Sequence, residues 1–243
     1  MAWKHHLRLI SLASAALVLS VSAARADTFG FNIMDMERAN GSPWHGRQSY
    51  TFPSEDGDTA KSITVSALSL KAPSGQPTTL AEGYDSAGSI GVLANGDDEQ
   101  KVYNAEALHI RLGQQATKVA LTLKDLGPPD DPRHVLWSVT GKDASGRQVV
   151  IKGSIRGRGA PNDEMETFTI DQDMLTSALG QPAGGFTGPV AIEAITLSSL
   201  QERGTLAQLG DIRFDQSFYL VGVEATTGDE EDDDDDIGQK GNS

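Results

Sequence analysis

Alternating apolar and polar positions are the main structural signal along this chain. In "SITVSALSL", Ile63, Val65 and Ala67 fall on one face of an extended segment, with serine and threonine on the other. Period-two alternation with β-branched residues is typical of a half-buried strand. The same pattern recurs in "ALHIRL", "TKVALTLKDL", "HVLWSVTG", "QVVIKGSI", "ETFTI", "PVAIEAITL" and "SFYLVGV".

Turn-forming segments divide these strands and set the fold class. "KAPSGQP", "LGPPDDPR" and "KDASGR" each interrupt the alternation, and the prolines exclude a continuing central strand. Roughly ten short strands at roughly ten-residue spacing predict an all-β fold, an antiparallel β-sandwich of jelly-roll type. "DQDMLTSALG" predicts one short helix, capped by Asp171 or Asp173 and ended by Gly180.

The two ends of the chain differ from this pattern. Residues 1–26 have a basic start, an apolar middle and "ARA" at the close, which is the pattern of a secretory signal peptide cleaved after Ala26. We therefore expect an exported protein, periplasmic or extracellular, with no membrane span after cleavage. The acidic run from Asp229 to Asp236 predicts a disordered tail over residues 225–243, which leaves residues 27–224 as the β-sandwich domain.

Charge and cysteine content restrict the partners. Loss of Lys4, Arg8 and Arg25 leaves 20 − 3 = 17 basic residues against 34 acidic ones, a net charge of −17. Such a chain repels nucleic acid and anionic membranes. The absence of cysteine excludes disulfides, thiol catalysis and zinc–thiolate sites.

Catalytic motifs do not emerge from the sequence. There is no G-x-S-x-G elbow and no H-E-x-x-H helix, and the three histidines beyond the signal, His45, His109 and His134, are far apart. We therefore expect a protein that is not an enzyme. A carbohydrate-active hydrolase with two facing carboxylates stays an alternative, because so many acidic residues hide any particular pair.

Acidic residues at strand junctions are candidate calcium ligands. Asp97 and Asp98 lie in the turn "NGDDEQ", Glu106 begins the next strand, and Asp211 stands between apolar residues in "LGDIRF". Calcium binds about six to eight oxygens from carboxylates, carbonyls and water. A cation would also satisfy an aspartate placed in a strand. The alternative is that these are solvated turn and edge residues.

These segments resemble a group of exported bacterial β-sandwich domains. "GSIGVLANGDDEQ…NAEALHIRL", "TKVALTLKDLG…VLWSVTGKDASGRQV" and "IEAITLSS…LGDIRF" are similar to domains of PEP-CTERM-type exported proteins and RTX-type adhesins, over about residues 62–214. The resemblance implies a galactose-binding-like jelly roll, a structural calcium at Asp97, Asp98, Glu106 and Asp211, and an extracellular binding or matrix role. The C-terminal residues depart from it, because they contain no sorting motif.

Aromatic residues in polar contexts are candidate sugar platforms, since a pyranose stacks its apolar face on a ring. Trp44, Tyr84 and Tyr103 are the candidates, and local packing is the alternative for each. Trp137 alternates with Val135 and Val139, which predicts a core position. The sequence thus predicts an adhesin-like binding module for an extracellular polysaccharide or a cell-surface protein. The other possibility is a structural surface protein without a small ligand.

Overall fold

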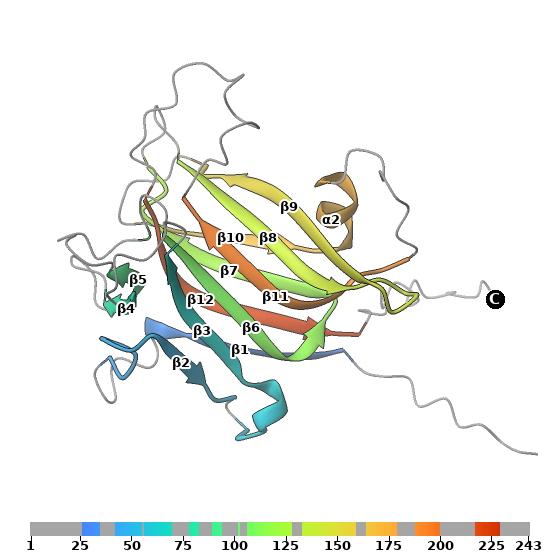
Figure 1. Cartoon of the computed structure of the whole chain (residues 1–243), viewed down its shortest axis with the longest axis horizontal. Coiled ribbons are helices and arrows are strands. Elements are labelled where there is room, and N and C mark those ends of the chain that lie inside the picture. The colour runs from blue at the N-terminus through green and yellow to red at the C-terminus, as the bar shows by residue number, and fades with distance from the viewer. Residues whose placement is uncertain are drawn as a thin grey trace, which may run out of the picture.

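The protein is a two-layer β-sandwich. The computed structural model describes residues 26–34, 42–54, 56–69, 78–82, 89–93, 102, 106–127, 133–158, 164–178, 188–199 and 217–228. These residues form two six-stranded sheets in which all the named pairings are antiparallel. Figure 1 shows one sheet in front of the other. The predicted antiparallel sandwich is confirmed.

Sheet A has the order β10-β7-β12-β5-β4, and β1 pairs with β12 beside β5. Its strands are β10 (Met165–Ile170), β7 (Lys118–Lys124), β12 (Tyr219–Thr227), β5 (Ile90–Leu93), β4 (Thr79–Glu82) and β1 (Asp27–Asn32). One edge of β12 is thus shared by two strands: β5 pairs with it at Leu220, and β1 pairs with it from Gly222 to Thr227.

Sheet B has the order β2-β3-β6-β11-β8-β9. Its strands are β2 (Ser49–Phe52), β3 (Ile63–Ser69), β6 (Glu106–Ala116), β11 (Ala191–Ser198), β8 (His134–Lys142) and β9 (Gln148–Arg156). The chain crosses repeatedly from one sheet to the other, as in jelly-roll sandwiches.

The apolar faces of both sheets meet in one core, as the alternation predicts. In β3, Ile63, Val65 and Ala67 are at most 1% exposed. Trp137 is also buried, as predicted, and lies opposite Gly153 of β9. A β-carbon at Gly153 would lie 2.3 Å from Cζ2 of Trp137, so the glycine leaves the space that the indole fills.

One short helix closes an end of the sandwich. Helix α2 (Gln172–Ala178) is capped by Asp171, whose Oδ1 accepts a hydrogen bond from Met174 N at 2.8 Å. The Gln172 side chain donates to Thr117 O (2.7 Å) and Val190 O (3.0 Å), which ties the helix to both neighbouring segments. A single-turn 3-10 helix, η1 (Thr59–Lys61), precedes β3. Within the described residues, no helix has the length and apolar character needed to cross a membrane.

Arg133 ties the two sheets together at one end. It precedes β8 of sheet B, and its Nη1 donates to Asp125 O (3.0 Å) after β7 and to Ser217 Oγ (2.8 Å) before β12. Nη1 also lies 2.9 Å from Asp125 Oδ2, and both side chains are largely buried. Asp125 has a positive φ of 63°, which is a left-handed backbone conformation, and this contact stabilises the turn there.

Candidate binding groove on the outer face of sheet A

A groove of about 740 Å³ lies on the outer face of sheet A. Its floor is formed by β1, β12, β7 and β10, and its rim includes Pro53, Ser54 and Asp56 beyond the end of β2. It therefore crosses the strands, and its lining comes from segments far apart in sequence. The described lining residues are Thr28, Phe29, Gly30, Phe31, Asn32, Pro53, Ser54, Asp56, Ala120, Thr122, Thr167, Gly222, Val223 and Glu224.

Strand register explains why the face is hollow. Gly30 of β1 pairs with Glu224 of β12, which pairs in turn with Ala120 of β7. The next outward row has Gly222 between Asn32 and Thr122. Because side chains in a row stand side by side, two glycines and an alanine leave open space around their longer neighbours.

Glu224 is the prominent polar group of the floor. Its side chain is exposed, and among the described residues none donates a hydrogen bond to it or forms an ion pair with it. The neighbouring Thr122 and Thr167 hydroxyls lie 3.1 Å apart and hydrogen-bond each other. Glu224 thus presents a carboxylate between Gly30 and Ala120 that no described residue engages, and such a group accepts strong hydrogen bonds from ligand hydroxyls.

Asp56, at the rim of the groove, is in contrast fully engaged. Its carboxylate accepts hydrogen bonds from Ser54 Oγ, from Asp58 N (2.9 Å) and from Lys61 Nζ (3.0 Å). The hydrogen bond from Ser54 is the main cause that holds the pKa of Asp56 well below its ordinary value, followed by those from Asp58 and Lys61. Hydrogen bonds to Asp27 and Asp56 in turn raise the pKa of Lys61. Asp56 therefore stays ionised and is unsuited to the general-acid role of a glycosidase.

Aromatic rings border the groove but belong to the core. Phe29 is 5% exposed. Phe31 stacks on Phe52 with ring centroids 3.8 Å apart and an interplanar angle of 14°. The recognition chemistry of the groove therefore rests on its hydroxyl, amide and carboxylate groups.

The aromatic residues singled out in the sequence lie elsewhere. Trp44 is fully buried and packs against Tyr50 and Phe52, with ring centroids 6.4 and 5.9 Å away. No face of its indole is open to a sugar, and its placement agrees with the alternative of local packing. Tyr84 and Tyr103 lie outside the described residues.

Of the four expected calcium ligands, Glu106 is described, and Asp97, Asp98 and Asp211 lie outside the described residues. Glu106 is the first residue of β6 and is 3% exposed. The flanks of the other segments approach this end of the sandwich, because Ser198 pairs with Ala107 and Val102 bridges to Phe218. Within the described part of the chain, no group of three or more His, Asp or Glu side chains could hold a metal.

Comparisons with known proteins show remote similarity alone. No family model matches the chain, and no curated protein matches it. The family 11 carbohydrate-binding module of a cellulosomal cellulase from Clostridium thermocellum has 12% identity and a TM-score of 0.33, over 74% of this chain and 86% of that one. A xylan-binding CBM22 domain from Paenibacillus barcinonensis has 8% identity and a TM-score of 0.35, over 85% and 98%.

The K2 cleaved adhesin domain of Lys-gingipain is a third similar structure, with 15% identity and a TM-score of 0.32, over 83% of this chain and 100% of that one. At TM-scores this low, none of these similarities identifies a ligand for this chain.

Proposed function

We propose that this protein is an exported, non-catalytic module that binds an extracellular polysaccharide in the groove of sheet A. The observation that carries the proposal is Glu224, an exposed carboxylate without a partner among the described residues, set between Gly30 and Ala120. Ligand sites generally combine a concave surface with a few placed polar groups, and this groove has that combination.

The proposed ligand is an uncharged sugar chain. A groove that crosses several strands suits an extended polymer better than a compact molecule, and its two carboxylates, Asp56 and Glu224, repel anions. Hydroxyl groups of a neutral sugar would donate to Glu224 and exchange hydrogen bonds with Thr122, Thr167 and Asn32. Asp56 is already engaged by Ser54, Asp58 and Lys61, so the described groove residues do not supply the second free carboxylate that the hydrolase alternative needs.

Affinity electrophoresis in gels containing neutral plant and bacterial polysaccharides tests the proposal. We expect at least one polymer to retard the protein. Glu224→Gln should weaken that affinity about tenfold, because a hydrogen bond to a charged group contributes about 1.5–3 kcal/mol. Glu164→Gln is the matched control, since Glu164 is also exposed but does not line the groove.

A second variant fills the groove without changing its charge. Ala120 faces outward beside Glu224, so Ala120→Leu should block a sugar chain while leaving the core intact. Circular dichroism would confirm that the variant folds. If every polysaccharide fails to retard the wild type, or if both groove variants bind like the wild type, the groove is not the binding site. The structural surface protein then becomes the better account.

Calcium is part of the same proposal. A buried Glu106 at the end of the sandwich where the flanks of the Asp97–Asp98 and Asp211 segments meet supports a structural ion there. Calcium at a hundredfold excess over its Kd should raise the Tm by about 5 °C, because it binds the native state alone. The rise should disappear with EDTA, with Glu106→Gln, and with Asp211→Asn. An unchanged Tm in EDTA would favour a domain held by its core alone.

A further inference from the structure

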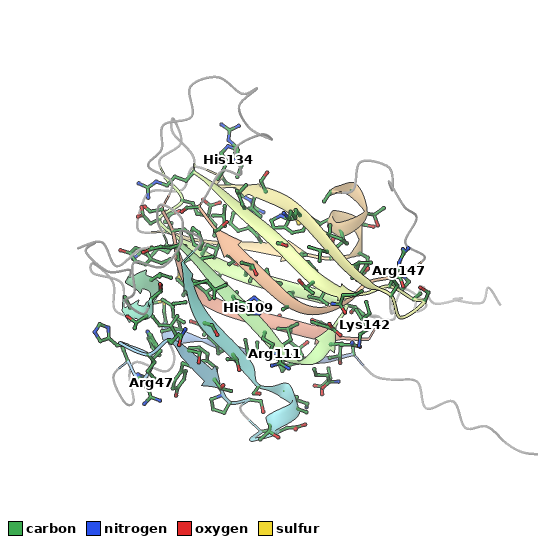
Figure 2. All side chains as sticks on the ribbon, viewed as in Figure 1. Arg47, His109, Arg111, His134, Lys142 and Arg147 are labelled. Carbon is green, nitrogen blue, oxygen red and sulfur yellow. The ribbon has the colours of Figure 1, made fainter. Side chains whose placement is uncertain are left out.

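The outer face of sheet B has the opposite chemistry to the groove. One cross-strand row runs Ser66–His109–Thr196–Ser138–Lys152 through five of its strands. Figure 2 shows His109 and Arg111 on this face, in the middle of the sheet. We call its basic residues the cationic face: His109, Arg111, His134, Lys142, Lys152 and Arg156.

The described outward residues of this face include one acidic side chain. Among the described outward residues of its strands, Glu193 is the acidic one, and it is held by Gln115 Nε2 (2.8 Å), Gln148 Nε2 (3.2 Å) and Lys142 Nζ (3.2 Å). Arg111 and Arg156 have no carboxylate partner among the residues that the structure describes. In a chain with a net charge of −14, two guanidinium groups on one sheet face thus have no acidic neighbour among the described residues.

The two histidines report the same positive field. Burial lowers the pKa of His109, and the neighbouring Arg111 lowers it further. Burial and then Arg156 act in the same way on the pKa of His134. An anion placed on this face would relieve both repulsions.

The described chain ends close to this face. Gly228 O accepts a hydrogen bond from Thr117 Oγ1 at 2.6 Å, directly after the long strand β6. Two residues earlier, Gln115 already points to the outer face, where it contacts Glu193. Arg111 lies six residues back along β6 from Thr117, which is at most about 20 Å at the rise of a strand, because β6 is bulged between Arg111 and Ala116.

The acidic run Asp229–Asp236 begins at the residue after Gly228. Eight residues span up to about 26 Å when extended, which is enough to reach Arg111 and the row of His109 and Lys152. Attachment to the same chain gives such a segment an effective concentration in about the millimolar range. The acidic run has the opposite charge to the cationic face, is long enough to reach it and begins close to it, so it is the favoured occupant of that face.

We propose that the acidic run Asp229–Asp236 docks on the cationic face of its own chain. The run then covers the basic residues of sheet B and competes with any external polyanion for them. Docking leaves the groove of sheet A open, because the groove is on the opposite outer face. This inference does not depend on polysaccharide binding, and its test uses no sugar.

Paramagnetic relaxation tests the docking directly. The chain has no cysteine, so Ile237→Cys gives a single site for a nitroxide label beside the run. The labelled protein comprises residues 26–243 and is measured at low salt. We expect the amide signals of Arg111 and Lys152 to broaden. Those of Thr167 and Ala120 on sheet A should stay sharp. Replacing every Asp and Glu of the run by Asn and Gln should remove the broadening, as should 0.5 M salt, since screening weakens exposed charge pairs.

Competition with an octaglutamate peptide provides a second readout. The run-neutralised chain is the variant in which every Asp and Glu of the run is replaced by Asn or Gln. It should bind the peptide about tenfold more tightly than the wild type, because it lacks the tethered competitor. Arg111→Gln with Arg156→Gln should abolish this gain. Arg47→Gln is the matched control, since Arg47 is exposed but lies outside the cationic face and contacts Tyr50.

Three outcomes would overturn the proposal. Equal peptide affinity of the wild type and the run-neutralised chain would mean that the face serves an external polyanion. Absence of peptide binding by both chains would remove the face as an anion site. Broadening that depends on protein concentration would assign the run to a second copy.

Discussion

The groove of sheet A and the outer face of sheet B are made of similar strands but have opposite chemistry. The groove has glycine and alanine beside a carboxylate, and its lining carries negative charge at Asp56 and Glu224. The face of sheet B has hydroxyl side chains between arginine, lysine and histidine, and Glu193, its described outward acidic group, is already held. The core fixes both faces by the same alternation, so the outward positions are free to differ. One fold therefore presents two surfaces with different charge.

Both surfaces depend on the contact by which Arg133 joins the two sheets. Arg133→Met should lower the free energy of unfolding by about 3 kcal/mol, because it removes the guanidinium that lies 2.9 Å from the largely buried Asp125 carboxylate. Urea unfolding at pH 7 measures this. Adding Asp125→Asn should recover part of the loss, since asparagine is uncharged and tolerates a positive φ. A loss below about 1 kcal/mol would show that the tie is no more than a surface ion pair.

Packing beneath the cationic face is the next test. Gly153→Ala should cost about 1–3 kcal/mol, because the new methyl group would overlap the Trp137 ring in a filled core. The neighbouring Ser154→Ala, which points outward, should change the stability by less than about 0.5 kcal/mol. Thermal unfolding of the pair makes the comparison. Equal stabilities would mean that the indole has room to move away.

Acid should lower the stability of the domain in part through the two histidines of the cationic face. The pKa values of His109 and His134 are lowered in the folded state, so folding favours their neutral forms. Their contribution to stability is therefore complete above the ordinary histidine pKa of 6.5 and is lost as the pH falls below it. In the run-neutralised chain, His109→Gln with His134→Gln should reduce the loss of stability between pH 8 and pH 5. Chemical unfolding at the two pH values measures this difference, which is the smallest of the expected effects. If the double variant loses as much stability as its parent, groups other than the two histidines cause the loss.

The sequence was sufficient for the elements whose alternation is regular. The buried positions of β3, β6, β7 and β8 are those predicted, and Asp171 caps the expected helix. Strand β4 was not predicted, because Thr79–Glu82 is short and lacks a clear period. Strand β12 continues to Thr227, beyond the expected domain end at Glu224, because it pairs with β1 along its whole second half.

The groove could not be predicted in the same way. Gly30, Glu224 and Ala120 are far apart in sequence, and they form one row of neighbours through strand register alone. A lone glutamate within the apolar strand "YLVGVEATT" was the available signal. Trp44 shows the limit of local context: its neighbours in sequence are polar, yet long-range packing against Phe52 buries the ring, which is the packing alternative left open by the sequence.

An NMR titration of the ¹⁵N-labelled chain with a neutral oligosaccharide, released from the polymer that retards it, tests the central claim most directly. The account predicts that shifts concentrate at the amides of Gly30, Ala120, Gly222 and Glu224, with Arg111 and Lys152 unchanged. Shifts confined to sheet B, or spread evenly over both faces, would contradict the assignment of sugar binding to the groove of sheet A.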